Sequence, residues 1–308
     1  MSNSNFINIK IKKMNWIKKG ASLLLIITLC GLLIFAISNE DKNKITHEGT
    51  TFYFPTEVDF AGENMPLEIP DVRERFDREL LVNANLHAST ILIIKRANRA
   101  FKVIEPILEK NGVPNDFKYL AVIESSLINA VSPAGAKGVW QFMPATAKEI
   151  GLEVNECVDE RYHLEKSTEA ACKFLLAAKE KFGSWTLAAA SYNGGITGVN
   201  KQIDIQKVSN YYDLLLNDET SRYVFRILAL KEIMKAPNKF GFEIPKQDLY
   251  ELYPTRKIEI DSSVNNLADF AIRQGVNYKI LKLYNPWLRD TKLDNKTRKK
   301  YLIELPNK

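Results

Sequence analysis

Residues Asn115–Gly151 read NDFKYLAVIESSLINAVSPAGAKGVWQFMPATAKEIG, and this stretch decides the fold. It begins with an apolar run that contains a single carboxylate, Glu124. Phe117, Leu120, Ala121 and Glu124 follow the spacing i, i+3, i+4, i+7, which places them on one face of a helix. The pattern therefore predicts a helix that carries Glu124 on its buried side, near its C-terminal end.

Burial would change the chemistry of this carboxyl group. Loss of hydration disfavours the charged form of an acid and raises its pKa. A raised pKa is what a general acid needs to protonate a sugar leaving group near neutral pH. The same residue would be an ordinary surface glutamate if the helix turned that face to solvent, and this stretch alone leaves both interpretations open.

Short blocks of sequence around and beyond Glu124 follow one another in a characteristic order. They are Glu124-Ser125, Gly138-Val139-Trp140-Gln141-Phe142-Met143-Pro144, Ser191-Tyr192-Asn193-Gly194-Gly195 and Glu219-Thr220-Ser221-Arg222-Tyr223-Val224. In this order they resemble the lytic transglycosylases of bacterial cell walls, a lysozyme-like family. The Trp-Gln form of the second block resembles the membrane-bound lytic murein transglycosylase D-like subgroup. The resemblance covers about Pro66 to Ala236.

The resemblance implies a mostly α fold, with a lysozyme-like (goose-type) helical catalytic domain. It implies Glu124 as the catalytic residue and a hydrogen bond to its carboxyl from a tyrosine hydroxyl, that of Tyr223. The expected substrate-binding and positioning residues are Ser125, Gln141, Met143, Tyr192, Asn193 and Tyr223. The amide of Gln141 can both donate and accept hydrogen bonds, which suits an N-acetyl group or a sugar hydroxyl. Trp140 is compatible with either a sugar-facing or a core position.

The activity implied by the resemblance is that of a lyase acting on peptidoglycan glycan strands. Such an enzyme cleaves the β-1,4 bond between N-acetylmuramic acid and N-acetylglucosamine and leaves a 1,6-anhydro sugar. One carboxylate acts first as acid and then as base. A lysozyme using water would instead need a second carboxylate, for which Glu149, Glu153 and Asp159 are candidates by proximity in sequence. A non-catalytic wall-binding protein is the remaining alternative.

The composition changes after Ile258, where a strand-helix-helix-strand pattern begins. This order, together with Asn285-Pro286-Trp287-Leu288, resembles a LysM module, a small α+β unit that binds N-acetylglucosamine polymers. The usual Gly-Asp-Thr opening is missing, and Asp261-Ser262-Ser263 stands near its place. Both glycan binding and a purely packing role are open for this module.

The N-terminus indicates a membrane segment. A cluster of lysines within residues 10–19 precedes an uncharged run, residues 21–37, which is just long enough to cross a hydrocarbon core of ~30 Å. The lysines hold their end in the cytoplasm, so the rest of the chain is expected on the periplasmic side. The alternatives are a cleaved signal peptide ending near Ala36-Ile37-Ser38 and a lipid-modified Cys30.

The predicted domain layout has five parts. They are a basic cytoplasmic segment at 1–20, a membrane anchor or signal segment at 21–37, a linker at 38–70, the catalytic domain at 71–245 and the LysM-like module at 256–308. Within the linker, Thr51-Phe52-Tyr53-Phe54 is either a short strand, a docked segment or loosely ordered chain. Helical patterns are expected over 71–111, with Pro106 in the last turns, and over 159–182, 185–192 and 209–236.

Other classes of function find little support in the sequence. The net charge of +6 suits an anionic wall polymer or a membrane surface, and we see no nucleic-acid-binding motif. His47, His87 and His163 lie far apart, so we predict neither a metal site nor a cofactor. Cys157 and Cys172 are compatible with a disulfide or with two free thiols. The sequence does not indicate an oligomeric state.

Overall fold

The computed structural model describes residues 53–307, which lie within a compact unit spanning Tyr53–Lys308. The predicted basic segment 1–20 and membrane segment 21–37 lie outside the described residues. Within residues 53–307, no helix combines the length and the apolar character that a membrane span requires.

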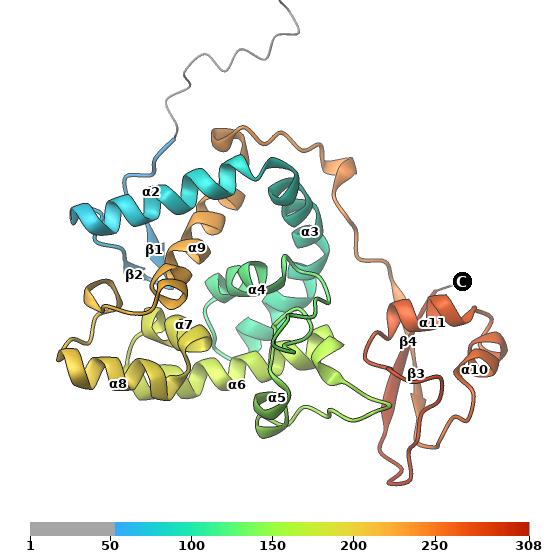
Figure 1. The fold of residues 1–308 in the computed structure, drawn as a ribbon. Helices are drawn as coiled ribbons and strands as arrows, with labels where there is room; N and C mark the ends of the chain where they lie inside the picture. The colour runs from blue at the N-terminus through green and yellow to red at the C-terminus, as the bar shows by residue number, and fades with distance from the viewer. Residues whose placement is uncertain (1–52, 308) are drawn as a thin grey trace, which may run out of the picture. The chain divides into compact units, whose positions relative to one another are not determined.

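The first and larger part of this unit is helical, as predicted (Figure 1). Its helices are α2 (Pro70–Asn85), α3 (His87–Lys110), α4 (Lys118–Ser125), α5 (Pro144–Glu149), α6 (Leu164–Phe182), α7 (Trp185–Gly194), α8 (Ile196–Gln206) and α9 (Asp218–Lys235). Short 3₁₀ turns connect or extend them: η1 (Asn115–Phe117), η2 (Glu160–Tyr162), η3 (Tyr211–Asp213), η4 (Pro237–Phe240) and η5 (Lys246–Asp248). Together with the small C-terminal region described below, this confirms the predicted mostly α fold class.

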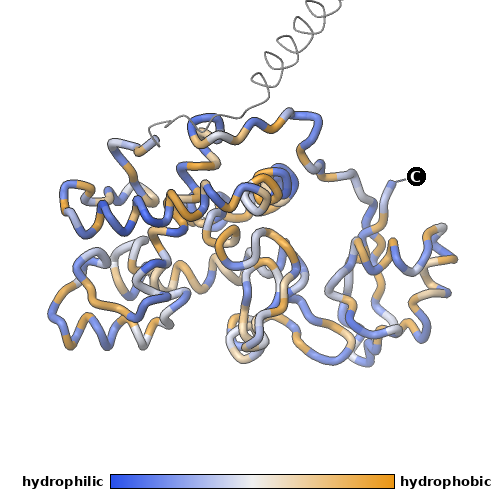
Figure 2. Tube along the Cα trace, turned by 45° about the horizontal axis from the view of Figure 1, so that its top comes forward, coloured by the Kyte–Doolittle hydropathy of each residue, from blue (hydrophilic) through white to orange (hydrophobic). Residues whose placement is uncertain are grey.

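Helix α4 lies inside this assembly, packed against α3 and α9 (Figure 1). Its residues Tyr119 to Val122 are all buried, and the Phe117 ring beneath its first turn is fully buried. Helix α9 is buried along most of its length, from Thr220 to Ile233. Hydrophobic and hydrophilic residues alternate along the outer helices (Figure 2), as expected where one face packs inward and the other meets water.

Several boundaries differ from the sequence prediction. Helix α8 was not predicted, and it follows α7 directly because Gly195 adopts a φ of 73° and turns the chain. Helix α9 begins at Asp218 because the Asn217 side chain accepts a hydrogen bond from the amide of Thr220 and caps its N-terminus. Helix α6 begins only at Leu164, since the residues before it form the buried turn η2.

The part of the predicted 38–70 linker that the structure describes is folded against the helices. It contains a short hairpin of β1 (Asp59–Phe60) and β2 (Glu63–Asn64), and Phe60 is fully buried. The Glu63 carboxylate accepts hydrogen bonds from the first amides of α7, those of Trp185 and Thr186, at 2.6 and 2.9 Å. A carboxylate at a helix N-terminus satisfies free amides and complements the helix dipole, which explains why this segment docks.

The C-terminal region has the predicted order of strand, helix, helix and strand. Its elements are β3 (Thr255–Ile260), α10 (Leu267–Arg273), α11 (Tyr278–Tyr284) and β4 (Tyr301–Pro306). The two strands pair antiparallel, with Ile258 opposite Ile303. Asn266 and Asn277 cap the two helices with their side chains. The region thus has a hydrophobic core beneath a two-stranded sheet.

Candidate active site

Glu124 is the last residue but one of α4, and the helix ends directly beyond it. Ser126 adopts a left-handed conformation with φ of 53°, which stops the helix and turns the chain away. The Glu124 side chain is partly buried and points toward α9, where the Tyr223 hydroxyl donates a hydrogen bond to Glu124 Oε1. The structure therefore contains the tyrosine–carboxyl contact that the family resemblance implies.

The surroundings of Glu124 favour its protonated form. Burial raises the pKa of Glu124 to about 7, and the charge of Glu219 acts in the same direction. The hydrogen bond from Tyr223 and the positive charge of Arg226 lower this pKa, but by less. Among these neighbours only Arg226 is a cation, and its guanidinium donates to the Ile123 carbonyl at 3.5 Å. A carboxyl group in this position can hold a proton at neutral pH and release it to a bound substrate.

Residues 135–142, which we call the 135–142 turn, lie against the end of α4. The Ser125 hydroxyl is buried and donates to the Val139 carbonyl at 2.8 Å, which joins the helix to the turn. Gly138 has a φ of 83°, and a Cβ atom there would lie 1.8 Å from the Arg161 carbonyl oxygen. Only glycine fits this position, because the turn passes directly against the backbone of a later segment.

The polar and apolar side chains of this turn have distinct surroundings. Gln141, at a φ of 51°, donates from Nε2 to the carbonyls of Ala130 and Gly138 at 3.1 and 2.6 Å. Trp140 is 0% exposed and donates to Thr168 Oγ1 at 2.8 Å, so it belongs to the core. Met143, just beyond the turn, is 42% exposed and accessible to a ligand.

Helix α7 contributes Tyr192 and Asn193 to the same neighbourhood. The Tyr192 hydroxyl donates to the Trp140 carbonyl at 2.7 Å, and burial together with the charge of Glu124 raises the pKa of this tyrosine. Asn193 donates to Glu219 at 2.9 Å and accepts from the Thr220 hydroxyl at 2.7 Å. These hydrogen bonds link sequence blocks that are far apart in the chain and bring them together near the Glu124 carboxyl.

Comparison with known proteins identifies two domains in this chain. A sequence model of the transglycosylase SLT domain matches residues 102–215, and one of the soluble lytic transglycosylase C-terminal LysM-like domain matches residues 256–308. The chain contains a lytic transglycosylase SLT domain. A LysM-like domain follows it. Tyr223 lies beyond the residues matched by the SLT model, although it contacts Glu124 directly.

The chain is also similar to individual curated proteins. Membrane-bound lytic murein transglycosylase D from Escherichia coli (strain K12) is 29% identical over 243 residues, which cover 76% of this chain and 52% of that protein. The protein of the same name from Escherichia coli O6:H1 matches equally. A putative tributyltin chloride resistance protein from Alteromonas sp. (strain M-1) is 33% identical over 90 residues, 29% of this chain and 44% of that protein. The chain is a distant homologue of the E. coli proteins and spans about half their length.

Sequence reasoning missed a buried ion pair that supports the SLT domain. Asp159 and Arg161 are both buried, and Arg161 donates to both carboxylate oxygens of Asp159, at 2.9 and 2.8 Å. The same guanidinium donates from Nη1 to the carbonyls of Gly135 and Phe142, at 3.2 and 3.1 Å. The available signal was a pair of opposite charges two residues apart, in a stretch that also contains Glu153, Glu156 and Glu160.

The carboxylates considered for a water-using mechanism have other surroundings. Asp159 is engaged by Arg161, and Glu153 accepts hydrogen bonds from Tyr301 and Lys299 of the LysM-like domain. Glu149 is exposed at the end of α5. The carboxylate whose charge acts on Glu124 is instead Glu219, which the sequence interpretation did not single out.

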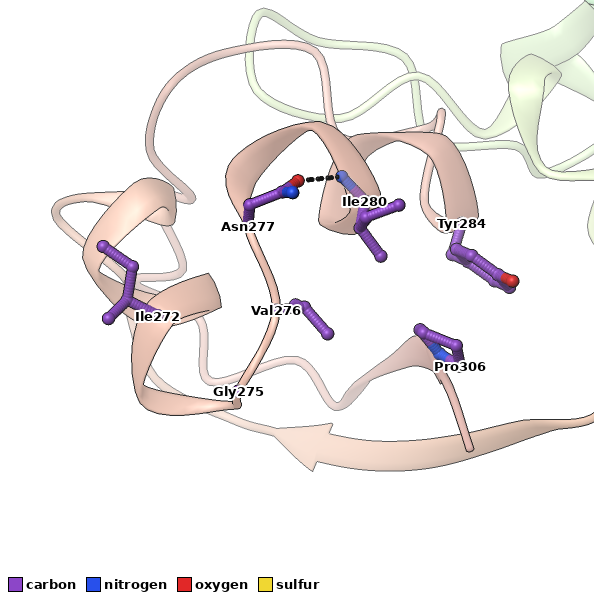
Figure 3. A pocket seen from close by; sticks show the side chains of 7 residues that line it. All are labelled: Ile272, Gly275, Val276, Asn277, Ile280, Tyr284 and Pro306. Carbon is purple, nitrogen blue, oxygen red and sulfur yellow. Dashed lines mark hydrogen bonds between the residues drawn. The ribbon is translucent and has the colours of Figure 1, made fainter. Parts of the chain in front are cut away.

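The LysM-like domain has a groove of its own, with a volume of about 640 Å³ (Figure 3). It lies between the turn joining α10 to α11 and the end of β4, and its walls are formed by Ile272, Val276, Ile280, Tyr284 and Pro306. The Asn277 side chain at its edge accepts from the Ile280 amide and so is used as a helix cap. No carboxylate lines this groove.

The structure also bears on the predictions about a disulfide and about metal ligands. Cys157 and Cys172 are both buried free thiols, so the alternative of a disulfide between them does not hold. Between residues 53 and 307, no group of His, Cys, Asp and Glu side chains is suited to hold a metal ion.

Proposed function

We propose that this protein is a peptidoglycan lytic transglycosylase that cleaves the β-1,4 bond between N-acetylmuramic acid and N-acetylglucosamine. The observation that supports this most directly is the Glu124 carboxyl, held at a helix end by the Tyr223 hydroxyl with a pKa raised to about 7. Such a group is protonated in much of the population at neutral pH and can act as a general acid.

In the proposed mechanism, one carboxyl group serves both chemical steps. Glu124 first donates its proton to the glycosidic oxygen, and the leaving sugar departs with the electron pair of the broken bond. The resulting carboxylate then takes the proton of the muramic C6 hydroxyl as that oxygen bonds to C1. The substrate supplies its own nucleophile, so neither water nor a second carboxylate is needed. The acetamido group of the substrate stabilises the positive charge that develops at C1.

The neighbouring residues have supporting roles in this proposal. Tyr223 orients the carboxyl of Glu124 and stabilises its charged form after the first proton transfer. Asn193 and exposed Met143 contact the sugar. The hydrogen bonds of Ser125 and Tyr192 to the 135–142 turn suggest that these hydroxyls position the turn, and Gln141 presents its amide oxygen from a fixed side chain.

The location follows from the substrate. Peptidoglycan lies outside the cytoplasmic membrane, so we propose that residues 21–37 anchor or export the chain and that the catalytic domain works on the periplasmic side. The E. coli relatives are membrane-bound by name. We also propose that the LysM-like domain binds the glycan.

Mass spectrometry of digested sacculi tests the proposed function. We expect products that end in 1,6-anhydromuramic acid, each lighter by one water than the corresponding reducing sugar. Glu124→Gln should produce neither, while Glu149→Gln, which removes an exposed carboxylate, should match the parent. Reducing ends would contradict the proposal and favour a lysozyme. A parent protein that binds sacculi and releases nothing would favour the non-catalytic alternative.

A further inference from the structure

Residues 157–162 of the SLT domain pair with the LysM-like domain through their backbone. Val158 forms an antiparallel bridge with Leu288, and both side chains are fully buried. The amide of Asp159 donates to the Trp287 carbonyl at 2.9 Å, and the amide of Arg289 donates to the Cys157 carbonyl at 2.8 Å. The segment therefore pairs with the LysM-like domain much as a strand pairs in a sheet.

Side chains reinforce this contact. Cys157, Val158 and Tyr162 belong to one hydrophobic cluster with Leu288 and other core residues of the LysM-like domain. The Arg289 guanidinium lies over the Tyr162 ring, 4.2 Å from its centroid. At the edge of the contact, Glu153 accepts from Lys299 Nζ at 2.6 Å and from the Tyr301 hydroxyl at 3.0 Å.

The same segment contacts the active site from its other side. Asp159, whose amide bonds to the LysM-like domain, holds the guanidinium of Arg161 through two hydrogen bonds. Arg161 in turn holds both ends of the 135–142 turn, through the carbonyls of Gly135 and Phe142. A buried guanidinium with fixed partners is rigid, because each of its bonds restricts the planar group.

We propose that Arg161 is the positioning residue of the 135–142 turn, and that the LysM-like domain keeps Arg161 in place through residues 157–162. In this arrangement the C-terminal domain is a structural support of the acid site, whether or not it also binds glycan. The inference rests on the proposed function for its activity measurements, and on the structure alone for the exchange measurements below.

The 135–142 turn influences the pKa of Glu124 by limiting how much water reaches its carboxyl group. The 135–142 turn contacts α4 at Ser125 and α7 at Tyr192, next to Glu124. A loosened turn admits water, and since burial is the main reason for the raised pKa of Glu124, its pKa should fall. A substitution at Arg161 leaves the other charged and titratable groups that face this end of α4 in place. They are Arg96 on α3, Tyr192 on α7, and Glu219, Tyr223 and Arg226 on α9.

The first test is Arg161→Lys, which keeps the charge beside Asp159 but loses the forked donors. We expect kcat to fall by roughly tenfold to a hundredfold, as small misplacements of catalytic groups do, with a smaller change in KM. We expect the basic limb of the pH–rate profile near pH 7 in the parent and at lower pH in Arg161→Lys. The matched control is Arg256→Lys in the LysM-like domain, which also loses a bond to a carbonyl, that of Gln274, and should change neither.

The second test breaks the domain contact from the side of the SLT domain. Glu153→Lys removes the carboxylate that accepts from Lys299 and Tyr301 and places a second positive charge beside Lys299. Its control, Glu156→Lys, makes the same charge change at an exposed position of the same loop. We expect faster amide hydrogen exchange in residues 157–162 and 135–142 for Glu153→Lys only. Turnover should fall severalfold and the basic limb should shift in the same direction as in Arg161→Lys.

The outcomes separate this inference from the proposed function. A folded Arg161→Lys whose activity falls equally at every pH, with an unmoved basic limb, would show a merely structural role and overturn the inference. Glu153→Lys would also overturn it if amide exchange became faster in residues 157–162 but stayed unchanged in residues 135–142.

If the parent yields reducing ends, the transglycosylase proposal fails, and the exchange results still decide the role of Arg161. If Arg161→Lys does not fold, the Glu153→Lys and Glu156→Lys pair decides alone.

Discussion

Two glutamates of the helical region, the partly buried Glu124 and the buried Glu160, have pKa values shifted in opposite directions. Burial raises the pKa of Glu124 to about 7, and its hydrogen-bond partner, Tyr223, is neutral. Burial alone would also raise the pKa of Glu160, but the amide of Glu153 and the ammonium groups of Lys166 and Lys299 hold that pKa below its ordinary value. A buried carboxyl with a neutral partner can carry a proton, whereas one with cationic partners stabilises the structure as an anion.

The largest expected effect is the loss of activity on replacing Glu124. Glu124→Gln keeps the shape of the side chain and can still accept from the Tyr223 hydroxyl, but it cannot donate or take back the proton. We expect the rate of anhydro-sugar release to fall by about 10²–10⁴-fold, the usual contribution of a general acid–base group. Glu160→Gln leaves the acid itself intact and disturbs only the 157–162 segment, so the activity of its folded fraction should fall no more than severalfold. Equal losses in the two variants would remove the distinction between them.

The close packing of Gly138 against the backbone of Arg161, the residue after Glu160, predicts a large loss of stability when Gly138 is replaced. Gly138→Ala places a Cβ atom 1.8 Å from the Arg161 carbonyl oxygen and also strains a backbone with φ of 83°. We expect it to lower the free energy of unfolding by about 3 kcal/mol or more. Gly135→Ala is the control, because its φ is 90° and no atom lies within 4 Å of the added Cβ. It should cost only the backbone strain, about 1 kcal/mol. Similar urea midpoints for both variants would contradict this packing.

The two glutamates also predict opposite effects of charge removal on stability. Because the folded pKa of Glu124 is raised, its stabilising protonated form is lost as the pH rises through about 7, and Glu124→Gln should stabilise the fold above that pH by up to roughly 3 kcal/mol. Because the folded pKa of Glu160 is lowered, its contribution is present above its ordinary value and is lost only in acid.

Glu160→Gln should therefore destabilise the protein at pH 7 by about 1–3 kcal/mol, since it leaves cations without their partner. Thermal melts between pH 4 and pH 9 measure both variants on one scale. A Glu124→Gln variant that is less stable than the parent above pH 8 would show that its carboxylate is stabilised like that of Glu160.

A smaller and directional effect is expected at Tyr223. Its hydrogen bond lowers the pKa of Glu124, so Tyr223→Phe should move the basic limb of the pH–rate profile upward, opposite to Arg161→Lys. The rate below the limb should fall about tenfold, since the carboxyl loses its orienting partner. Tyr212→Phe is the control, because the buried Tyr212 hydroxyl has no hydrogen-bond partner among residues 53–307 and its removal should leave the profile unchanged. A downward shift for Tyr223→Phe would contradict the assigned hydrogen bond.

Much of this could be predicted from the sequence. The spacing of Phe117, Leu120 and Glu124 indicated the buried face of α4, and the order of short blocks indicated which distant residues surround it. The strand-helix-helix-strand pattern after Ile258 was also recovered, because each helix begins at an asparagine cap and each strand alternates. These features are local, so a pattern in the chain is enough to reveal them.

The features that the sequence did not reveal depend on contacts between distant segments. Glu63 caps α7 across more than a hundred residues, which turned part of a predicted linker into folded structure. The role of Arg161 depends on carbonyl groups, and no side-chain pattern marks a carbonyl. Likewise, the pairing of Val158 with Leu288 uses backbone atoms of two loops, so only the fold shows that the two domains share this contact.

A carbon NMR titration of the side-chain carboxyl groups tests the central claim most directly. With Glu124→Gln and Glu160→Gln used to assign the two signals, Glu124 should titrate near pH 7 in the folded protein, while Glu160 titrates below the ordinary value for glutamate. A Glu124 signal that titrates at or below that ordinary value would contradict the account, because the proton it is meant to donate would already be absent at neutral pH.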